Sequence, residues 1–210
     1  MWNDTLQEYF GISVDYCRGL SAALFTSGSA SDASLVLIPF STMNDGFVAL
    51  SNNTIDVLSG AVYSMENDIS HPVTKDGYSF SDIFYYHSAN SSSAGTDGGG
   101  GGDSSQELVL PLAMATRQRD VQWTDFVKAI GMCPIHAELS GINQTTAVEM
   151  PTIQLFGLKY RQSLRDIILK IGNYDEIYQR NMQRYLPRVD NPRNILNTGG
   201  NPMLFTNWKF

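Results

Sequence analysis

Apolar residues recur at every third or fourth position in five stretches of the chain, and this spacing predicts five helices. In the first stretch Val14, Cys17, Leu20 and Leu24 share one face, which is the pattern of a helix that buries one side. The five predicted helices cover residues 13–24, 42–50, 120–130, 164–171 and 173–185.

Short polar residues mark the starts of these helices, because their side chains accept hydrogen bonds from the free N–H groups of the first turn. Ser13, Thr42, Asp120 and Asn173 occupy such positions. Gly131 is expected to end the third helix, since glycine readily adopts the backbone conformation that follows a helix.

Two short apolar runs in the first half predict buried strands, at residues 35–40 and 55–58. The order of elements there is helix, strand, helix, strand. Successive strands that are separated by helices pair in parallel through right-handed crossovers. The sequence therefore predicts an α/β fold with a mainly parallel sheet flanked by helices.

A stretch of small and polar residues, 88–105, divides the chain and includes five consecutive glycines at 98–102. Such a segment behaves as a flexible connector and would span about 20–25 Å as a random coil. Beyond it the pattern is mostly helical. We expect residues 11–87 and 106–187 to form a single discontinuous domain joined by this linker, followed by an irregular tail at 188–210.

Composition and charge narrow the classes of function. Hydrophobic residues make up 42% of the chain and charged residues 17%, which is typical of a globular protein. The formal net charge is −7, with −11 in residues 1–110 and +4 in residues 111–210. An acidic total opposes binding to phosphate backbones, so no nucleic-acid partner is predicted. The apolar runs fall far short of the ~20 residues of a membrane helix, so membrane insertion is not predicted.

Motifs of catalytic sites are missing from the sequence, among them Gly-x-Ser-x-Gly and His-Glu-x-x-His. Cys133 and His136 have the spacing of metal ligands, but a structural zinc site needs four ligands and no second pair follows. The sequence therefore predicts neither an enzyme nor a cofactor or metal ion. It leaves open whether Cys17 and Cys133 form a disulfide, which depends on their distance in the fold.

Polar side chains follow the predicted strand 55–58, namely Ser59, Tyr63, Ser64 and Asn67. Ligands of open α/β sheets bind outside the carboxyl ends of the strands. These four residues are therefore the candidate ligand-binding site. The alternative is a strand-to-helix turn in which Ser64 caps a helix and Asn67 is merely exposed.

Four blocks of the sequence resemble the family 3 extracellular solute-binding proteins, and most of all the general L-amino-acid-binding branch. These proteins are the amino-acid-binding components of ABC importers. The blocks cover a helix, the approach to a strand, a segment that enters the hinge between two lobes, and a closing helix. They lie at residues 14–25, 49–58, 79–86 and 172–181.

The resemblance implies one lobe of a type II periplasmic-binding-protein fold, because the linker 88–105 stands where the family has its second lobe. It also implies that the protein binds amino acids or similar small polar solutes for import, with an ABC permease as a candidate partner. The family implies a periplasmic or extracellular location, although no signal peptide is visible in this sequence.

Two departures from the family pattern concern this lobe: the first implies that binding is weakened, and the second bears on the stability of the fold. The family's ligand motif is Thr/Ser-x-x-Arg, and this sequence has Ser64 followed by Asn67 where the arginine is expected. Asparagine lacks the charge and the forked geometry with which arginine holds a carboxylate. The family's first strand is absent or replaced by residues 1–10. The alternative function is a truncated or degenerate paralogue that acts as an interaction or sensory module without ligand capture.

Overall fold

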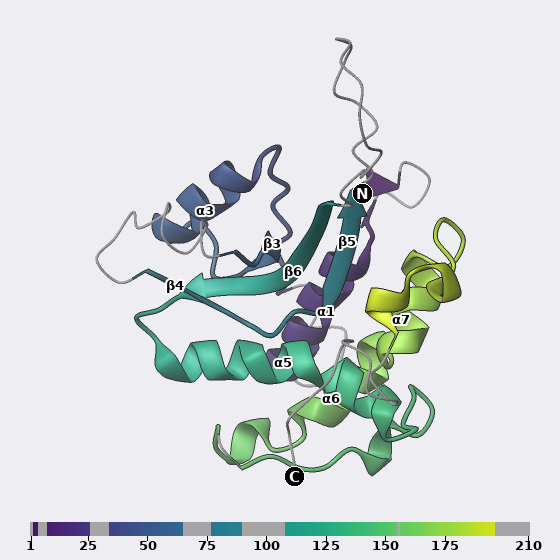
Figure 1. Ribbon diagram of the computed structural model, residues 1–210. Coiled ribbons are helices and arrows are strands. Elements are labelled where there is room, and N and C mark those ends of the chain that lie inside the picture. Colours follow the sequence, from purple (N-terminus) through teal and green to yellow (C-terminus); the bar gives the residue numbers. More distant parts are fainter. Residues whose placement is uncertain are drawn as a thin grey trace, which may run out of the picture.

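Helices and a small sheet form a layered α/β structure (Figure 1). None of the helices in the described part of the chain has the length and apolar content of a membrane-spanning segment. The computed structural model describes residues 2–3, 8–25, 34–64, 77–89, 108–154 and 156–195.

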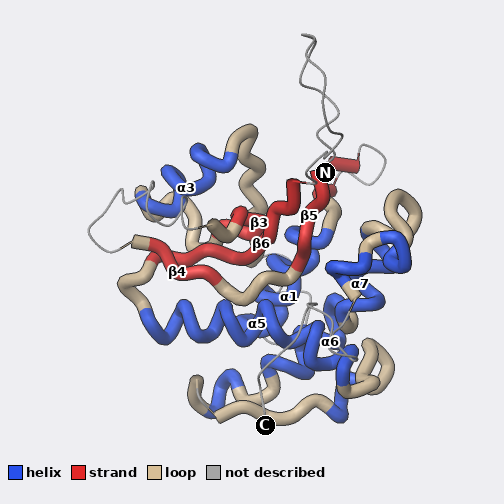
Figure 2. Tube along the Cα trace, in the orientation of Figure 1, coloured by secondary structure: helices blue, strands red, loops and turns tan. Residues whose placement is uncertain are grey.

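The central strand of the main sheet is β6 (Leu108–Arg117). On one edge it pairs with β3 (Leu58–Val62), and on the other with β4 (Tyr78–Phe80) and β5 (Tyr85–Ala89), as Figure 2 shows. All these pairs are antiparallel, so the expected mainly parallel pairing is wrong. Strands β3, β4 and β5 each pair with β6 and not with one another. Because β6 runs in the direction opposite to all three, every pair is antiparallel.

The linker joins two neighbouring strands of this sheet. Ser88 and Ala89, which were expected to begin the linker, belong to β5 and pair with Val109 and Leu108 of β6. The linker residues from 90 onward lie outside the described residues. Backbone hydrogen bonds between β5 and β6 therefore join the part of the chain before the linker directly to the part after it.

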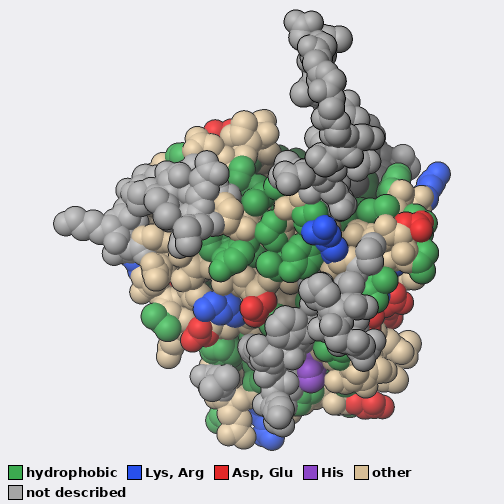
Figure 3. All heavy atoms as spheres, viewed as in Figure 1, with side chains coloured by type: hydrophobic (Ala, Val, Ile, Leu, Met, Phe, Trp, Pro, Cys, Tyr) green, Lys and Arg blue, Asp and Glu red, His purple; other side chains and the backbone are tan. Residues whose placement is uncertain are grey.

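The two faces of the sheet carry separate hydrophobic clusters, because successive residues of a strand point to opposite sides. Met114 of β6 belongs to the larger cluster, with α1, α5, α6 and α7, whereas the next residue, Ala115, belongs to the smaller cluster with α3. Hydrophobic side chains gather over the middle of the sheet on the face seen in Figure 3. The helices are α1 (Ile12–Phe25), α3 (Met43–Ser51), α5 (Val121–Leu139), α6 (Ser163–Ile171) and α7 (Tyr174–Asn181).

Close packing of α1 on α6 holds the two halves of the chain together. Gly19 of α1 lies so near α6 that a Cβ atom there would come within 2.7 Å of Cδ1 of Ile171. Ser163 Oγ at the start of α6 donates a 3.0 Å hydrogen bond to the carbonyl oxygen of Ala23. These contacts explain why α1 carries a small residue in the middle of its buried face.

Most of the expected helix starts are confirmed. Thr42 and Asp120 accept hydrogen bonds from the first turns of α3 and α5, and Asn173 forms a reciprocal capping box with Glu176 at the start of α7. Ser13 does not cap α1, which begins at Ile12, because the carbonyl of Gly11 already accepts from the N–H of Asp15.

Helix α5 does not end at Gly131 but continues through Pro134 to Leu139. Gly131 instead lies against Ser81 and Met114, where a Cβ atom would be 3.3 Å from Cβ of Ser81. Burial of the helix against the sheet thus offsets the weak helix preference of glycine, which costs about 1 kcal/mol. Glycine serves here for close approach, not as a stop.

The expected strands differ from the sequence prediction. Residues 35–40 form no strand, and the strand expected at 55–58 begins only at Leu58 and continues to Val62. The tail begins with two short 3-10 turns, and Asn194 in the second is fully buried.

The remaining elements are β1 (Trp2–Asn3) and β2 (Glu8–Tyr9), which pair with each other, and 3-10 turns at Ala147–Glu149, Leu158–Tyr160, Arg188–Asp190 and Pro192–Asn194.

Candidate functional site

A cleft of about 880 Å³ lies between α1, the segment 35–40 and the approach to β3. One side of α1 forms a wall through side chains that include Ser13, Cys17 and Leu20. Residues 35–40 and 54–60 form the other walls, and Trp123 also lines the cleft.

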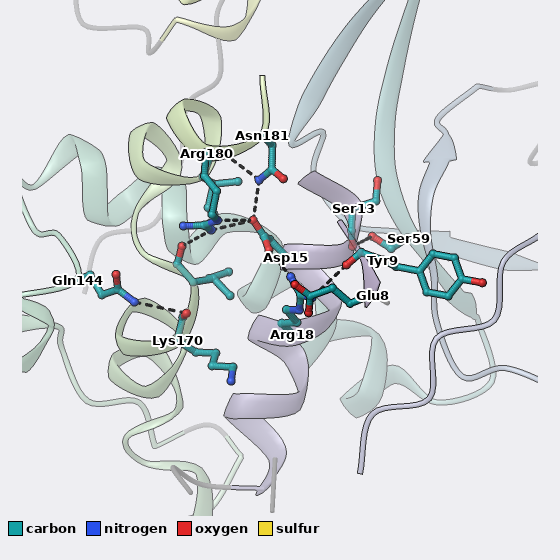
Figure 4. Close-up of polar contacts among 12 residues, drawn as sticks. Glu8, Tyr9, Ser13, Asp15, Arg18, Ser59, Gln144, Lys170, Arg180 and Asn181 are labelled. Carbon is teal, nitrogen blue, oxygen red and sulfur yellow. Dashed lines mark hydrogen bonds and ion pairs between the residues drawn. The ribbon is translucent and has the colours of Figure 1, made fainter. Parts of the chain in front are cut away.

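A bulge at Gly60 shapes this cleft. The register between β3 and β6 shifts between Ser59 and Ala61, and Gly60 between them has φ +82°, which strains any residue with a side chain. A Cβ atom at Gly60 would also lie 2.7 Å from Oγ of Ser13. Ser59 Oγ donates a 2.9 Å hydrogen bond to the carbonyl oxygen of Ser13, and Figure 4 shows these two residues side by side.

The thiol of Cys17 lies in the wall of the cleft. Burial raises the pKa of Cys17 to about 11, although the side chain of Ser59 and the charge of Arg18 act in the opposite direction. Both cysteines are free, so the disulfide that the sequence left open does not form. Cys17 is therefore a neutral thiol at physiological pH.

We expect alkylation of Cys17 by iodoacetamide to be slow at neutral pH, because only the thiolate reacts. The rate should still rise about tenfold between pH 9 and pH 10, since the pKa of Cys17 is about 11. Mass spectrometry of the labelled peptide measures the rate, and Cys17→Ser identifies the labelled site. A rate that levels off near the ordinary thiol pKa of about 8.5 would contradict the buried placement.

The structure places the candidate residues Ser59 and Tyr63 on opposite faces of the sheet. Ser59 points to α1, whereas the ring of Tyr63 meets Phe80 edge-on at 5.2 Å between centroids, on the α3 face. Without the bulge at Gly60, two residues four positions apart would point the same way. Ser64 follows Tyr63 directly and is half-buried, and Asn67 lies outside the described residues.

Tyr63 continues the ladder beyond β3, because its N–H donates a 2.8 Å hydrogen bond to the carbonyl oxygen of Pro111. Its side chain is 49% exposed. Neither Tyr63 nor Ser64 lines the cleft between α1 and residues 35–40, whereas Ser59 does. Among the described candidate residues, Ser59 thus lies at the cleft, whereas Tyr63 and Ser64 lie at the end of β3 and outside the cleft.

Metal binding finds no support among the described residues, which contain no group of three or more His, Cys, Asp or Glu side chains suited to an ion. Burial raises the pKa of the Cys133 thiol and lowers the pKa of His136. A metal binds the thiolate of cysteine, and this buried thiol resists ionisation. Cys133 donates instead to the carbonyl oxygen of Leu164 at 3.5 Å.

The cleft itself was not predicted from the sequence. Its wall at 35–40 was expected to be a buried strand, yet Val36 is 78% exposed. Cys17 was placed on a helix face, and Trp123 falls within the helix expected at 120–130, but neither was assigned to a ligand site. An apolar run with a proline at Pro39 could have indicated an unpaired edge segment, because proline is confined to the margins of sheets.

Comparison with known proteins identifies the fold. No protein-family model matches the sequence, and no curated protein matches it. The structure is similar to a solved "ABC transporter / periplasmic binding protein from Brucella ovis with glutathione bound", with a TM-score of 0.65 and 20% sequence identity. The match covers 89% of this chain and 84% of that chain. The predicted fold class, an α/β fold like that of periplasmic binding proteins, is thereby confirmed.

Proposed function

We propose that the protein binds amino acids or similar small polar solutes at the carboxyl end of β3, beside Tyr63, Ser64 and Asn67. One observation carries this proposal: Tyr63 and Ser64 directly follow a strand of an open α/β sheet whose fold is similar to that of a periplasmic binding protein. Ligands of open α/β sheets bind at such strand ends.

The chemistry of the ligand follows from what amino acids and glutathione share. The similar structure from Brucella ovis has glutathione bound, and glutathione carries the same α-ammonium and α-carboxylate groups as a free amino acid. The half-exposed ring of Tyr63 offers an apolar surface for a solute, and the hydroxyl of Ser64 offers a polar contact. Asn67 stands where the resembling family has its carboxylate-binding arginine, so we propose weak binding.

The proposed role is solute capture for import, with an ABC permease as partner and a periplasmic or extracellular location. The fold likeness to a transporter binding protein supports this role over catalysis. We also propose that residues 11–87 and 106–187 act as one binding lobe. The larger hydrophobic cluster supports that proposal, because its members come from both parts of the chain.

Calorimetric titration with the twenty amino acids and with glutathione tests the site. Tyr63→Ala should weaken the binding of any ligand found by at least about tenfold, because it removes the exposed ring beside the strand end. Ser59→Ala is the matched control, since Ser59 points to the opposite face, and it should leave affinity unchanged. If no solute binds, the interaction module without ligand capture becomes the better account.

Restoring the family residue with Asn67→Arg should strengthen amino-acid binding by about 1–3 kcal/mol, roughly 5- to 150-fold. The guanidinium would supply a forked, charged partner for the ligand carboxylate. Asn67→Lys is the control, because it adds the charge without the fork and should gain less. Loss of binding in Asn67→Arg, after tight binding by the natural chain, would show that the ligand carboxylate lies elsewhere.

A further inference from the structure

A second pocket, of about 460 Å³, lies between the start of α5 and the loop that leads into α6. This volume is within the range of about 300–1,000 Å³ that is typical of pockets for small molecules. Leu24 borders both this pocket and the cleft beside α1. The second pocket is an aromatic pocket, because its lining includes Trp123 and Phe126 of α5 and Phe156 and Tyr160 of the loop.

The rings of the aromatic pocket stand in two directions. Trp123 stacks on Phe126, with 6.1 Å between the ring centroids and 18° between the planes. Phe156 and Tyr160 meet Phe126 edge-on, at 86° and 62° between planes. Phe126 is only 4% exposed, so the rings open to a ligand are the three half-buried ones. Rings that meet at steep angles can turn their faces toward one small ligand, as in the aromatic cages that hold ammonium groups.

Hydrogen bonds on both sides of the pocket hold these rings in place. The backbone N–H of Trp123 donates a 2.9 Å hydrogen bond to Oδ1 of Asp120, and the indole Nε1 donates to the carbonyl oxygen of Asp56 at 3.3 Å. Across the pocket, Gly157 has φ +88°, which favours glycine, and its carbonyl oxygen accepts from the N–H of Tyr160 at 3.1 Å. Rings that are already ordered reduce the entropy cost of binding.

The charge of the aromatic pocket favours a cation. Asp120 is the only acidic or basic residue among the described residues that line it. The ammonium group of Lys159 lies 5.1 Å from the ring centroid of Tyr160, so one of these rings already holds a cation on its face. A carboxylate attracts a cation and repels an anion, and the aromatic faces add a second attraction for the cation.

We propose that the aromatic pocket binds a quaternary or methylated ammonium group, held between the faces of Trp123, Phe156 and Tyr160 beside the carboxylate of Asp120. A quaternary ammonium carries its charge without N–H donors, so no donor is left unpaired when rings surround it. A primary ammonium would lose hydrogen bonds to water that these rings do not replace.

This site is separate from the proposed solute site. Trp123 packs on the larger hydrophobic cluster, whereas Tyr63 meets Phe80, which packs on the smaller cluster across the sheet. Tyr63→Ala should therefore leave ammonium binding unchanged, and loss of the aromatic pocket should leave amino-acid binding beside Tyr63 unchanged. The two proposals can fail separately.

Calorimetric titration of the full-length chain with choline chloride and with tetramethylammonium chloride tests the proposal. The neutral alcohol in which a carbon atom replaces the nitrogen of choline has the same shape, and it should bind at least about tenfold more weakly because it lacks the charge. Equal affinity for choline and this alcohol would overturn the proposal, since the pocket would then recognise apolar shape alone. The absence of binding of both ammonium salts would also overturn it.

Two variants locate the site. Asp120→Asn keeps a residue that caps the helix but removes the charge, so it should weaken choline binding at least about fivefold and leave binding of the neutral alcohol unchanged. Tyr160→Leu removes one ring and should weaken choline binding at least about threefold. Asp125→Asn is the matched control, because Asp125 is exposed on α5 outside the pocket. Choline binding that neither Asp120→Asn nor Tyr160→Leu changes would place the ligand elsewhere and overturn the proposal.

The same ammonium chemistry occurs in free solutes and in choline lipid headgroups, and sedimentation with phosphatidylcholine vesicles distinguishes these sources. Sedimentation that Asp120→Asn weakens would identify headgroups as the ligand. Choline binding without sedimentation would identify a free solute. Both results support the proposed site.

Discussion

Arg188→Ala is expected to lower the free energy of unfolding by about 3 kcal/mol at neutral pH, because it leaves a largely buried carboxylate without its partner. The guanidinium donates to both carboxylate oxygens of Glu138, at 2.8 and 3.1 Å, and to Oδ1 of Asp175 at 2.9 Å. Only 12% of the Arg188 side chain and 19% of the Glu138 side chain are exposed. The guanidinium also lies 5.1 Å from the ring centroid of Tyr174, so the substitution loses packing as well.

The loss should depend on pH in a defined direction. Burial raises the pKa of Glu138, and Arg188 acts in the opposite direction. A raised folded-state pKa means that ionisation of Glu138 costs stability, and that this cost disappears as the pH falls through the pKa. Without Arg188, ionisation of Glu138 lowers the stability of the folded state by a larger amount. The deficit of Arg188→Ala should therefore be smaller near about pH 4 than near about pH 7.5.

Urea unfolding of the natural chain and the variant at both pH values measures this deficit. Arg184→Ala is the matched control, because Arg184 is an exposed arginine nearby on the chain, and it should change stability by less than about 0.5 kcal/mol. Arg188→Lys keeps the charge but loses the fork and should fall between the two. A deficit that is equal at both pH values would show that packing, not the unpaired carboxylate, accounts for the loss.

Helix positions could be read from the sequence because their signals are local. The capping box of Asn173 and Glu176 spans only four residues, and its two hydrogen bonds form within one turn of α7. Thr42 and Asp120 cap their helices for the same reason. The end of α5 could not be read in this way, because contacts of Gly131 with Ser81 and Met114 come from distant parts of the chain.

Strand positions depend on partners that the local sequence does not specify. The central strand β6 contains Ala113, Met114 and Ala115 in a row, all fully buried, so the strand lacks alternation between polar and apolar residues. Alanine and methionine also favour helices. Residues 35–40 have the composition of a strand but lack a partner among the described strands, and they form no strand.

The candidate site was only partly predictable for a related reason. The four residues were grouped because they follow the predicted strand 55–58. A strict two-residue period would place Ser59 and Tyr63 on one face of a strand. The extra residue Gly60 interrupts the alternation of side chains along β3, so the side chain of Ser59 points toward α1. A glycine inside a strand is a recognised signal of a bulge. The positive φ of Gly60 is thus the feature that divides the predicted site between two faces.

Asp15→Ala should lower the free energy of unfolding by about 3 kcal/mol, because Asp15 joins the first helix to the last. Its side chain is almost fully buried in α1, and Oδ2 accepts hydrogen bonds from Nε and Nη2 of Arg180 at 3.1 and 2.7 Å and from Nδ2 of Asn181 at 2.6 Å. Oδ1 accepts from Nη1 of Arg18 at 3.3 Å. Figure 4 shows these groups converging on one carboxylate from α1 and α7.

The expected size lies at the low end for a buried ion pair, because the arginines can turn toward water when the carboxylate is removed. The side chain of Arg180 is 46% exposed, and Nη2 keeps its 2.8 Å hydrogen bond to the carbonyl oxygen of Ile171. Asn181 keeps only its bond to Ile177, so one buried amide proton loses its acceptor. Asp125→Ala is the matched control, since Asp125 is exposed on α5 and lies 3.9 Å from Lys128, and it should cost less than about 1 kcal/mol. If urea unfolding gave the same loss for Asp15→Ala as for Asp125→Ala, α7 would be held to α1 by apolar packing alone.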